Sequence, residues 1–195
     1  MKLYQRVRAV GRIFNDLEKE TVKFKAQTGL SCLPLCGFCC TRPNVMASPV
    51  EFLPFAWSLY KEQRAEIFLD GLDQDDGAQC PLFRVIKAGE QKGFCGHYQS
   101  RGLVCRLFGF AAMINKHGQP ELSTCKLIKE DQPEKYQHAS RALKEGLKVP
   151  VYKDYYQRLA NIEPGGKVEL IGVNGAIRKA LEMVLWDRQY RRRAG

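Results

Sequence analysis

Apolar residues near the start of the chain recur at steps of three and four positions. This spacing places them on one face of a helix, while polar side chains cover the other face. The pattern predicts an amphipathic helix over residues 3–28, and Gly29 is the expected stop. The apolar positions of this helix are Leu3, Val7, Val10, Phe14, Leu17 and Phe24.

A second helix is predicted to begin in the sequence ASPVEF at residues 47–52. Ser48 is the expected N-cap, Pro49 the first helical residue and Glu51 the reciprocal acceptor of a capping box. We expect this helix to run to about Leu69. The later part of the chain is predicted to form helices over residues 133–146, 151–162 and about 174–190.

The segment from Cys80 to Cys125 has no long helical period and is punctuated by glycine and cysteine. Short strand candidates are RLFGFAAMI at residues 106–114 and, further on, GGKVELIGV at residues 165–173. Such a segment is typical of a backbone organised by bound metal rather than by a large apolar core. The predicted fold is therefore mainly α with irregular metal-organised loops and a few short strands, a small α+β cysteine-cluster domain flanked by helices.

The expected organisation along the chain has three parts that pack as one globular unit. Residues 1–29 form the N-terminal amphipathic helix, residues 30–126 the cysteine-cluster metal-binding domain, and residues 127–195 a C-terminal helical extension with a basic tail.

The chain carries a formal net charge of +10 over 195 residues. This charge permits binding to nucleic acid, anionic lipid or an acidic protein, but it also aids solubility. No nucleic-acid-binding motif accompanies the basic residues. We therefore interpret them as solvated helix faces and a basic tail, which contains Arg188, Arg191, Arg192 and Arg193.

Neither a signal peptide nor a membrane span is predicted. Arg6, Arg8 and Arg12 interrupt the region where a signal peptide needs an apolar stretch. The longest apolar run, from Leu107 to Ile114, is far too short to cross a bilayer. We expect a cytoplasmic protein, in which thiols stay reduced, and this favours metal ligation over disulfides.

The eight cysteines fall into a compact group with the spacing C-x3-C-x2-C-C and a dispersed group. Thiolates are ligands for zinc and for iron–sulfur clusters, and closing short loops between ligands costs little entropy. Neighbouring side chains of an extended backbone point to opposite sides, so the adjacent residues Cys39 and Cys40 can bind two different metal centres. The spacing leaves open one site with spare thiols or two four-ligand sites, and buried cysteines and disulfides are the alternatives. The compact group is Cys32, Cys36, Cys39 and Cys40, and the dispersed group is Cys80, Cys95, Cys105 and Cys125.

Several stretches resemble the YkgJ-type cysteine-cluster family. They are the compact group, SPVEF after it, QCPLF at Cys80 and FCGHYQSRGLVCRLFGF at residues 94–110. Members are described as zinc- or iron-chelating domains or iron–sulfur-cluster-containing proteins, so the resemblance over residues 30–126 implies metal binding. A larger relative, the flagellin lysine methylase, shows that the module can occur in an enzyme. The most diagnostic part is C-x2-Y-x2-R-x3-C-R, made by Cys95, Tyr98, Arg101, Cys105 and Arg106; the family usually has proline where this chain has Gly102.

Arg101 and Arg106 have two interpretations. A guanidinium beside a thiolate-ligated centre can donate hydrogen bonds to sulfur and offset its charge, which makes them candidates for the surroundings of the metal. The alternative is a salt bridge at the surface or the edge of the core. Tyr98 is a further candidate beside the centre, although packing explains it more simply. We do not expect His97, His117 or His138 to be ligands.

Three functions follow from these patterns. The first is a metal-binding protein that holds zinc or an iron–sulfur cluster, expected to be 4Fe–4S, for structure, electron transfer or metal handling. The second is an enzyme, either an iron–sulfur oxidoreductase or a radical S-adenosylmethionine enzyme. The spacing C-x3-C-x2-C is also the ligand spacing of radical S-adenosylmethionine enzymes. The third is a zinc-clipped module that binds nucleic acid or a protein partner through the basic termini. No motif of a hydrolase or a phosphate-binding loop is present.

Overall fold

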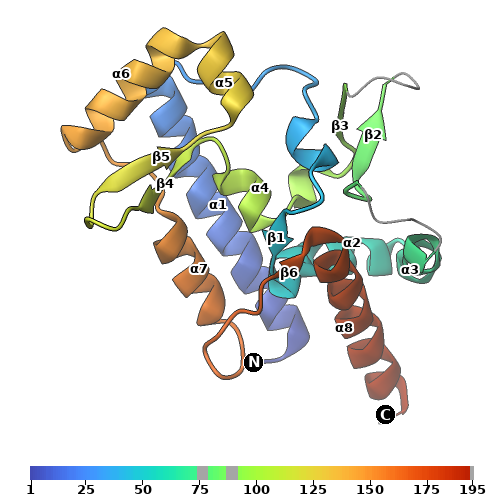
Figure 1. Cartoon of the computed structure of the whole chain (residues 1–195). Helices are drawn as coiled ribbons and strands as arrows, with labels where there is room; N and C mark the ends of the chain where they lie inside the picture. Colours follow the sequence, from blue (N-terminus) through green and yellow to red (C-terminus); the bar gives the residue numbers. More distant parts are fainter. Residues whose placement is uncertain (74–78, 87–91, 194–195) are drawn as a thin grey trace. The chain divides into compact units, whose positions relative to one another are not determined.

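The computed structural model describes residues 1–73, 79–86 and 92–193 of the chain (Figure 1). These residues divide into two compact units, each made of separate stretches of sequence. Unit 1 consists of Met1–Gly11, Leu35–Gly102 and Leu159–Gly195, and unit 2 of Arg12–Pro34 and Leu103–Arg158. The three-part division expected from the sequence concerns the linear order of the chain and stays a prediction.

The first predicted helix is confirmed as α1 (Leu3–Thr28). Its predicted apolar face is buried, and Gly29 ends it with a φ of 67°, a conformation that glycine adopts without strain. The Gly29 N–H donates a 2.8 Å hydrogen bond to the Lys25 carbonyl, which closes the last turn. Residues 3–11 of this helix belong to unit 1 and the rest to unit 2.

Unit 1 is built around helix α8 (Val173–Arg193). This helix packs against the 3₁₀ turn η2 (Pro49–Phe52), α2 (Leu53–Lys61) and α3 (Ala65–Asp73), as Figure 1 shows. The capping box predicted at Ser48 and Glu51 is confirmed, because the Glu51 carboxylate accepts the Ser48 N–H at 2.7 Å. The side chains of the predicted basic tail lie outside the described residues, except that of Arg188.

The helix expected from Ser48 to about Leu69 is wrong in its length. It stops at Lys61, and α3 starts at Ala65. Gln63 between them has a φ of 57°, a left-handed conformation that an α-helix does not contain. The Arg64 N–H donates to the Leu59 carbonyl at 2.8 Å, which caps the interrupted helix.

Two small antiparallel sheets belong to unit 1. Strand β1 (Met46–Ala47) pairs with β6 (Ile171–Gly172), so the stretch before η2 is joined to the stretch before α8. Strand β2 (Phe83–Val85) pairs with β3 (Gly93–Cys95). Two further 3₁₀ turns, η1 (Phe38–Thr41) and η3 (Tyr98–Ser100), complete this part of the unit.

Unit 2 contains the third antiparallel pair, β4 (Ala111–Ile114) and β5 (Pro120–Ser123). The strand predicted over residues 106–114 is confirmed in its second half as β4, but its first two residues belong to a helix. Unit 2 also contains α5 (Lys126–Asp131), α6 (Pro133–Lys144) and most of α7 (Tyr152–Ala160), and α6 packs on β5. The short helix α4 (Leu103–Leu107) carries part of the dispersed cysteine pattern. The predicted mainly α fold with a few short strands is confirmed. No helix in the described part of the chain is long and apolar enough to cross a membrane.

Candidate metal centre

Five of the eight cysteines lie in unit 1, in three neighbouring stretches that we call the cysteine loops: residues 35–46, 79–86 and 92–102. In the first stretch the chain turns sharply, with positive φ angles at Leu35 and Gly37. Gly37 precedes η1, and its carbonyl accepts the Cys40 N–H at 2.8 Å. A Cβ atom at Gly37 would lie 2.3 Å from the Phe83 ring, so glycine is required there both by φ and by space.

Backbone hydrogen bonds join the three stretches to one another. The Cys80 N–H donates to the Cys40 carbonyl at 2.9 Å, which brings the second stretch against the first. The Gly93 N–H donates to the Leu35 carbonyl at 3.1 Å, which brings the third stretch against the first. Cys95 is the register partner of Phe83, three residues after Cys80. Main-chain hydrogen bonds therefore help to position the cysteines.

Gly93 is a second position where only glycine fits. A Cβ atom there would lie 2.3 Å from the Arg84 carbonyl oxygen and 2.5 Å from the Phe83 ring. From the sequence, Gly37 is expected, with Pro34 and Pro43, to enforce an irregular loop, but no role is assigned to Gly93. The signal for Gly93 in the sequence is that it lies within two residues of a cysteine.

Three thiols of the cysteine loops are linked side chain to side chain. The Cys40 thiol lies within hydrogen-bonding reach of both Cys39 and Cys80, and its single proton can be donated to either of them. A hydrogen bond donated by Cys40 lowers the pKa of Cys39 to about 6; the positive charge of Arg101 also lowers this pKa, and burial opposes both effects. A hydrogen bond donated by Cys40 likewise lowers the pKa of Cys80, whereas the pKa of Cys40 is raised because ionisation would remove the proton that it donates.

Cys95 lies within the electrostatic reach of this group. Burial raises its pKa, and the charges of Cys80, Cys39 and Arg101 all act on it. Arg101 itself lies with its guanidinium 4.0 Å from the centre of the Tyr98 ring. The charge of Arg101 therefore reaches the thiols, and Tyr98 packs against the Arg101 guanidinium.

His97 has a packing role in the structure. Its ring meets the Phe55 ring edge to face, with 4.9 Å between the ring centres, and lies 6.4 Å from the Phe68 ring centre. Burial lowers its pKa, assisted by the nearby charges of Arg84 and Arg64.

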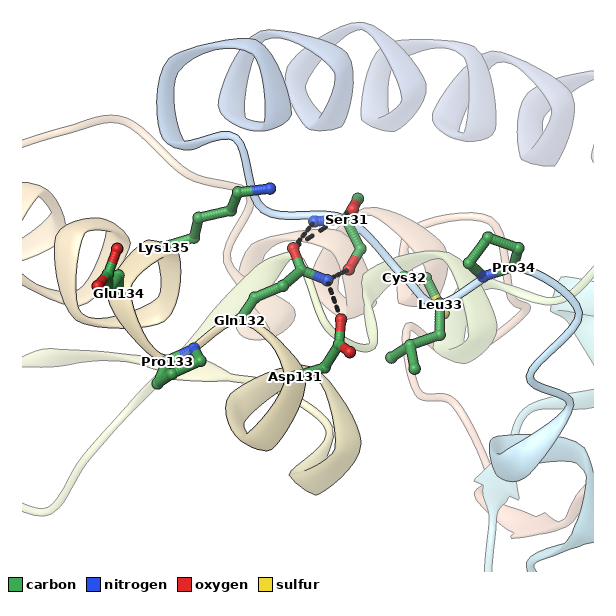
Figure 2. Close-up of a pocket in the computed structure, with 9 residues that line it drawn as sticks. All are labelled: Ser31, Cys32, Leu33, Pro34, Asp131, Gln132, Pro133, Glu134 and Lys135. Atoms are coloured by element: carbon green, nitrogen blue, oxygen red, sulfur yellow. Dashed lines mark hydrogen bonds between the residues drawn. The ribbon is translucent and has the colours of Figure 1, made fainter.

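The other three cysteines, Cys32, Cys105 and Cys125, lie in unit 2. Cys32 is exposed beside an open cleft of about 610 Å³, which Figure 2 shows between the segment Ser31–Pro34 and the segment Asp131–Lys135. Gln132 holds the two segments together, because its side-chain amide donates to the Ser31 carbonyl at 2.9 Å and accepts the Ser31 N–H at 3.2 Å. Cys105 is half-buried in α4, and Cys125 is buried at the N-cap of α5.

Arg106 also lies in unit 2, where it forms the salt bridge that the sequence left open as an alternative. Its guanidinium lies 3.6 Å from the Glu18 carboxylate and 4.4 Å from the centre of the Phe14 ring, both on α1. The residue is buried, so these contacts place a charge at the edge of the core of unit 2.

The donor atoms of the cysteine loops suit the metals that the sequence suggests. Cys39, Cys40, Cys80 and Cys95 supply four sulfur donors and no oxygen donor, a set that suits zinc or an iron–sulfur cluster. Among the residues that the structure describes, no three Cys, His, Asp or Glu side chains already have the arrangement of metal ligands. None of the eight cysteines forms a disulfide. The donor set fits these metals, and binding would require the thiol protons to leave and the side chains to turn toward the ion.

The fold and the thiols define a mainly helical, cysteine-rich protein. Residues 31–141 match the CxxCxxCC family, whose description is "putative zinc- or iron-chelating domain". The match covers more than half of the chain and includes all eight cysteines, and the chain belongs to this family. The predicted membership of a cysteine-cluster family is thereby confirmed. No curated protein and no solved structure matches the chain.

Proposed function

We propose that the cysteine loops hold zinc or an iron–sulfur cluster through Cys39, Cys40, Cys80 and Cys95. The observation that carries the proposal is the position of Cys40, whose carbonyl accepts the Cys80 N–H at 2.9 Å and whose thiol lies within hydrogen-bonding reach of Cys39 and Cys80. Sulfur atoms at such distances are close enough to bind one metal ion after the thiol protons leave. Cys36 lies in the same loops and is the fifth candidate ligand.

Each residue around the thiols has a separate task in this proposal. The frame of backbone hydrogen bonds keeps the cysteine loops together, so little chain entropy is lost when the thiolates converge. Arg101 offsets the negative charge that four thiolates bring to a partly buried place. When bound, zinc would supply a structural link, and a 4Fe–4S cluster would supply one-electron transfer.

The role that we propose is electron transfer or metal handling in the cytoplasm. A reduced compartment keeps the thiols available for a metal. The contribution of Cys32, Cys105 and Cys125 as further ligands stays a prediction from the sequence.

The test is purification of the full chain without oxygen, followed by metal analysis and an absorption spectrum. Stoichiometric iron with broad visible absorption indicates a cluster, and a colourless protein with tightly bound zinc indicates a zinc site. Absence of both metals from a folded chain, also after incubation with zinc or with iron and sulfide, would overturn the proposal.

Two matched cysteine variants locate the site. Cys40→Ser removes the central thiol of the cysteine loops and is expected to lower metal affinity by at least about 100-fold, more than the loss of an indirect contact. Cys125→Ala removes one thiol from unit 2, outside the group of Cys39, Cys40, Cys80 and Cys95, and is expected to lower metal affinity much less than Cys40→Ser does. Loss of metal in Cys125→Ala together with its retention in Cys40→Ser would contradict the ligand assignment.

A further inference from the structure

The cysteine loops contain cationic side chains and no carboxylate. The chain has 21 Asp and Glu residues, so their absence from these three stretches is a local feature. The positively charged residues of the cysteine loops are Arg42, Arg84, Lys92 and Arg101. Arg42, Arg84 and Lys92 are exposed, whereas Arg101 is half-buried beside the thiols.

Two aromatic rings are exposed among these cations. Phe94 is 48% exposed and Tyr98 is 55% exposed. Phe94 is the register partner of Arg84 in the β2–β3 pair, so the two side chains lie on the same face of the hairpin. Tyr98 has Arg101 at 4.0 Å from its ring centre. The surface therefore alternates flat apolar groups with positive charges.

Two carboxylates near this surface, among the residues that the structure describes, do not cancel its charge. Glu62, whose charge acts on His97, pairs with Arg64 at 3.4 Å. Glu51 lies near Gly102, but its side chain is fully buried and accepts the Ser48 N–H. The exposed charge of the cysteine loops is therefore positive.

We propose that the cysteine loops bind single-stranded nucleic acid. Grooves for single strands combine cations that contact phosphates with aromatic rings on which bases stack, because every base has a flat face. Phe94 and Tyr98 supply the rings, and Arg42, Arg84 and Lys92 supply the cations. An acidic protein would use the same cations but has no need of exposed rings, so the rings favour the nucleic acid. This inference goes beyond metal binding and holds for either metal.

The test is fluorescence anisotropy of a labelled oligothymidylate of about 16 nucleotides, titrated with the full chain at several salt concentrations. Phe94→Ala is expected to weaken binding by about 5- to 100-fold, the range found when a stacking ring is removed. Phe94→Tyr keeps a ring and is expected to bind as the parent chain does. Trp186→Ala is the matched control, because Trp186 is an exposed aromatic residue on α8 and is not part of the cysteine loops.

The charges are tested by the dependence of affinity on salt. Lys92→Gln is expected to reduce the slope of log affinity against log salt by about 0.7, the value for one phosphate contact on a single strand. Lys126→Gln, at an exposed lysine of unit 2, is expected to leave the slope unchanged.

Three outcomes would overturn the proposal. The first is an absence of binding at low salt. The second is equal weakening by the variants and their controls, which would indicate attraction to the overall charge alone. The third is binding that poly-glutamate displaces and that Phe94→Ala does not change, which would indicate an acidic protein as partner.

Discussion

The helices around α8 and the cysteine loops belong to the same unit but are held together differently. On α8, the side chains of Ala176, Ile177, Leu181 and Val184 are fully buried. In the cysteine loops the large side chains that are buried are Leu82 and Phe83, and the stretches are joined by backbone hydrogen bonds. Because apolar burial is the main source of folding free energy, we expect the helices to fold without metal. We expect the loops, which bury fewer large side chains, to depend more on their hydrogen bonds and on the proposed metal.

The largest expected effect on stability is in the helical part. Leu181→Ala removes a fully buried side chain and is expected to lower the free energy of unfolding by about 2–5 kcal/mol. Denaturant unfolding measures the loss, and metal content of the folded variant should not change. Leu170→Ala is the matched control, because Leu170 is exposed and its loss should change stability by less than about 0.5 kcal/mol. A Leu181→Ala variant that folds normally but binds no metal would contradict the view that the α8 core and the cysteine loops are stabilised independently.

The next largest effect is expected on metal affinity, from a substitution in the cysteine loops. Gly93→Ala places a methyl group against the Arg84 carbonyl, so β2 and β3 must move apart and Cys95 shifts with them. We expect metal affinity to fall by about 10- to 100-fold, as for other changes that displace a ligand without removing it. Competition with a chelator measures the affinity.

Gly71→Ala is the control for Gly93→Ala. A Cβ at Gly71, in helix α3, has no atom within 4 Å. Alanine should therefore stabilise the chain by about 0.5–1 kcal/mol through helix propensity and leave metal affinity unchanged. Equal metal affinities in the two variants would contradict the role given to the β2–β3 pair.

A smaller effect on the free energy of unfolding is expected at the capping box of η2. Glu51→Ala removes the acceptor of the Ser48 N–H at a fully buried position, and an unsatisfied buried donor costs about 1–3 kcal/mol. Glu51→Gln keeps an oxygen acceptor and should lose less. Thermal unfolding compares the two variants, and equal losses would show that the hydrogen bond contributes little.

Some elements were predictable because their signals are local. The apolar spacing predicts α1, and Ser48, Pro49 and Glu51 predict the start of η2, since these features depend on neighbours in sequence. The break at Gln63 was not predictable, because no glycine or proline marks its left-handed conformation. Strands of two or three residues, such as β1 and β2, are too short to show an alternating pattern.

For the candidate site, the sequence predicts the thiols but not how they are grouped. Spacing alone does not place Cys80 beside Cys40. The two residues are far apart in sequence, and the hydrogen bond from the Cys80 N–H to the Cys40 carbonyl forms only in the folded chain. The need for glycine at positions 37 and 93 arises from the Phe83 ring, which reaches both of them only in the folded chain.

The most direct test of the central claim is amide hydrogen exchange of the chain with and without its metal. We predict that removal of the metal speeds exchange at the N–H groups of Cys40, Cys80 and Gly93, while exchange in the buried turns of α8 stays unchanged. Unchanged exchange in the cysteine loops, or an equal increase along the whole chain, would contradict the claim that the metal organises these loops and not the helices.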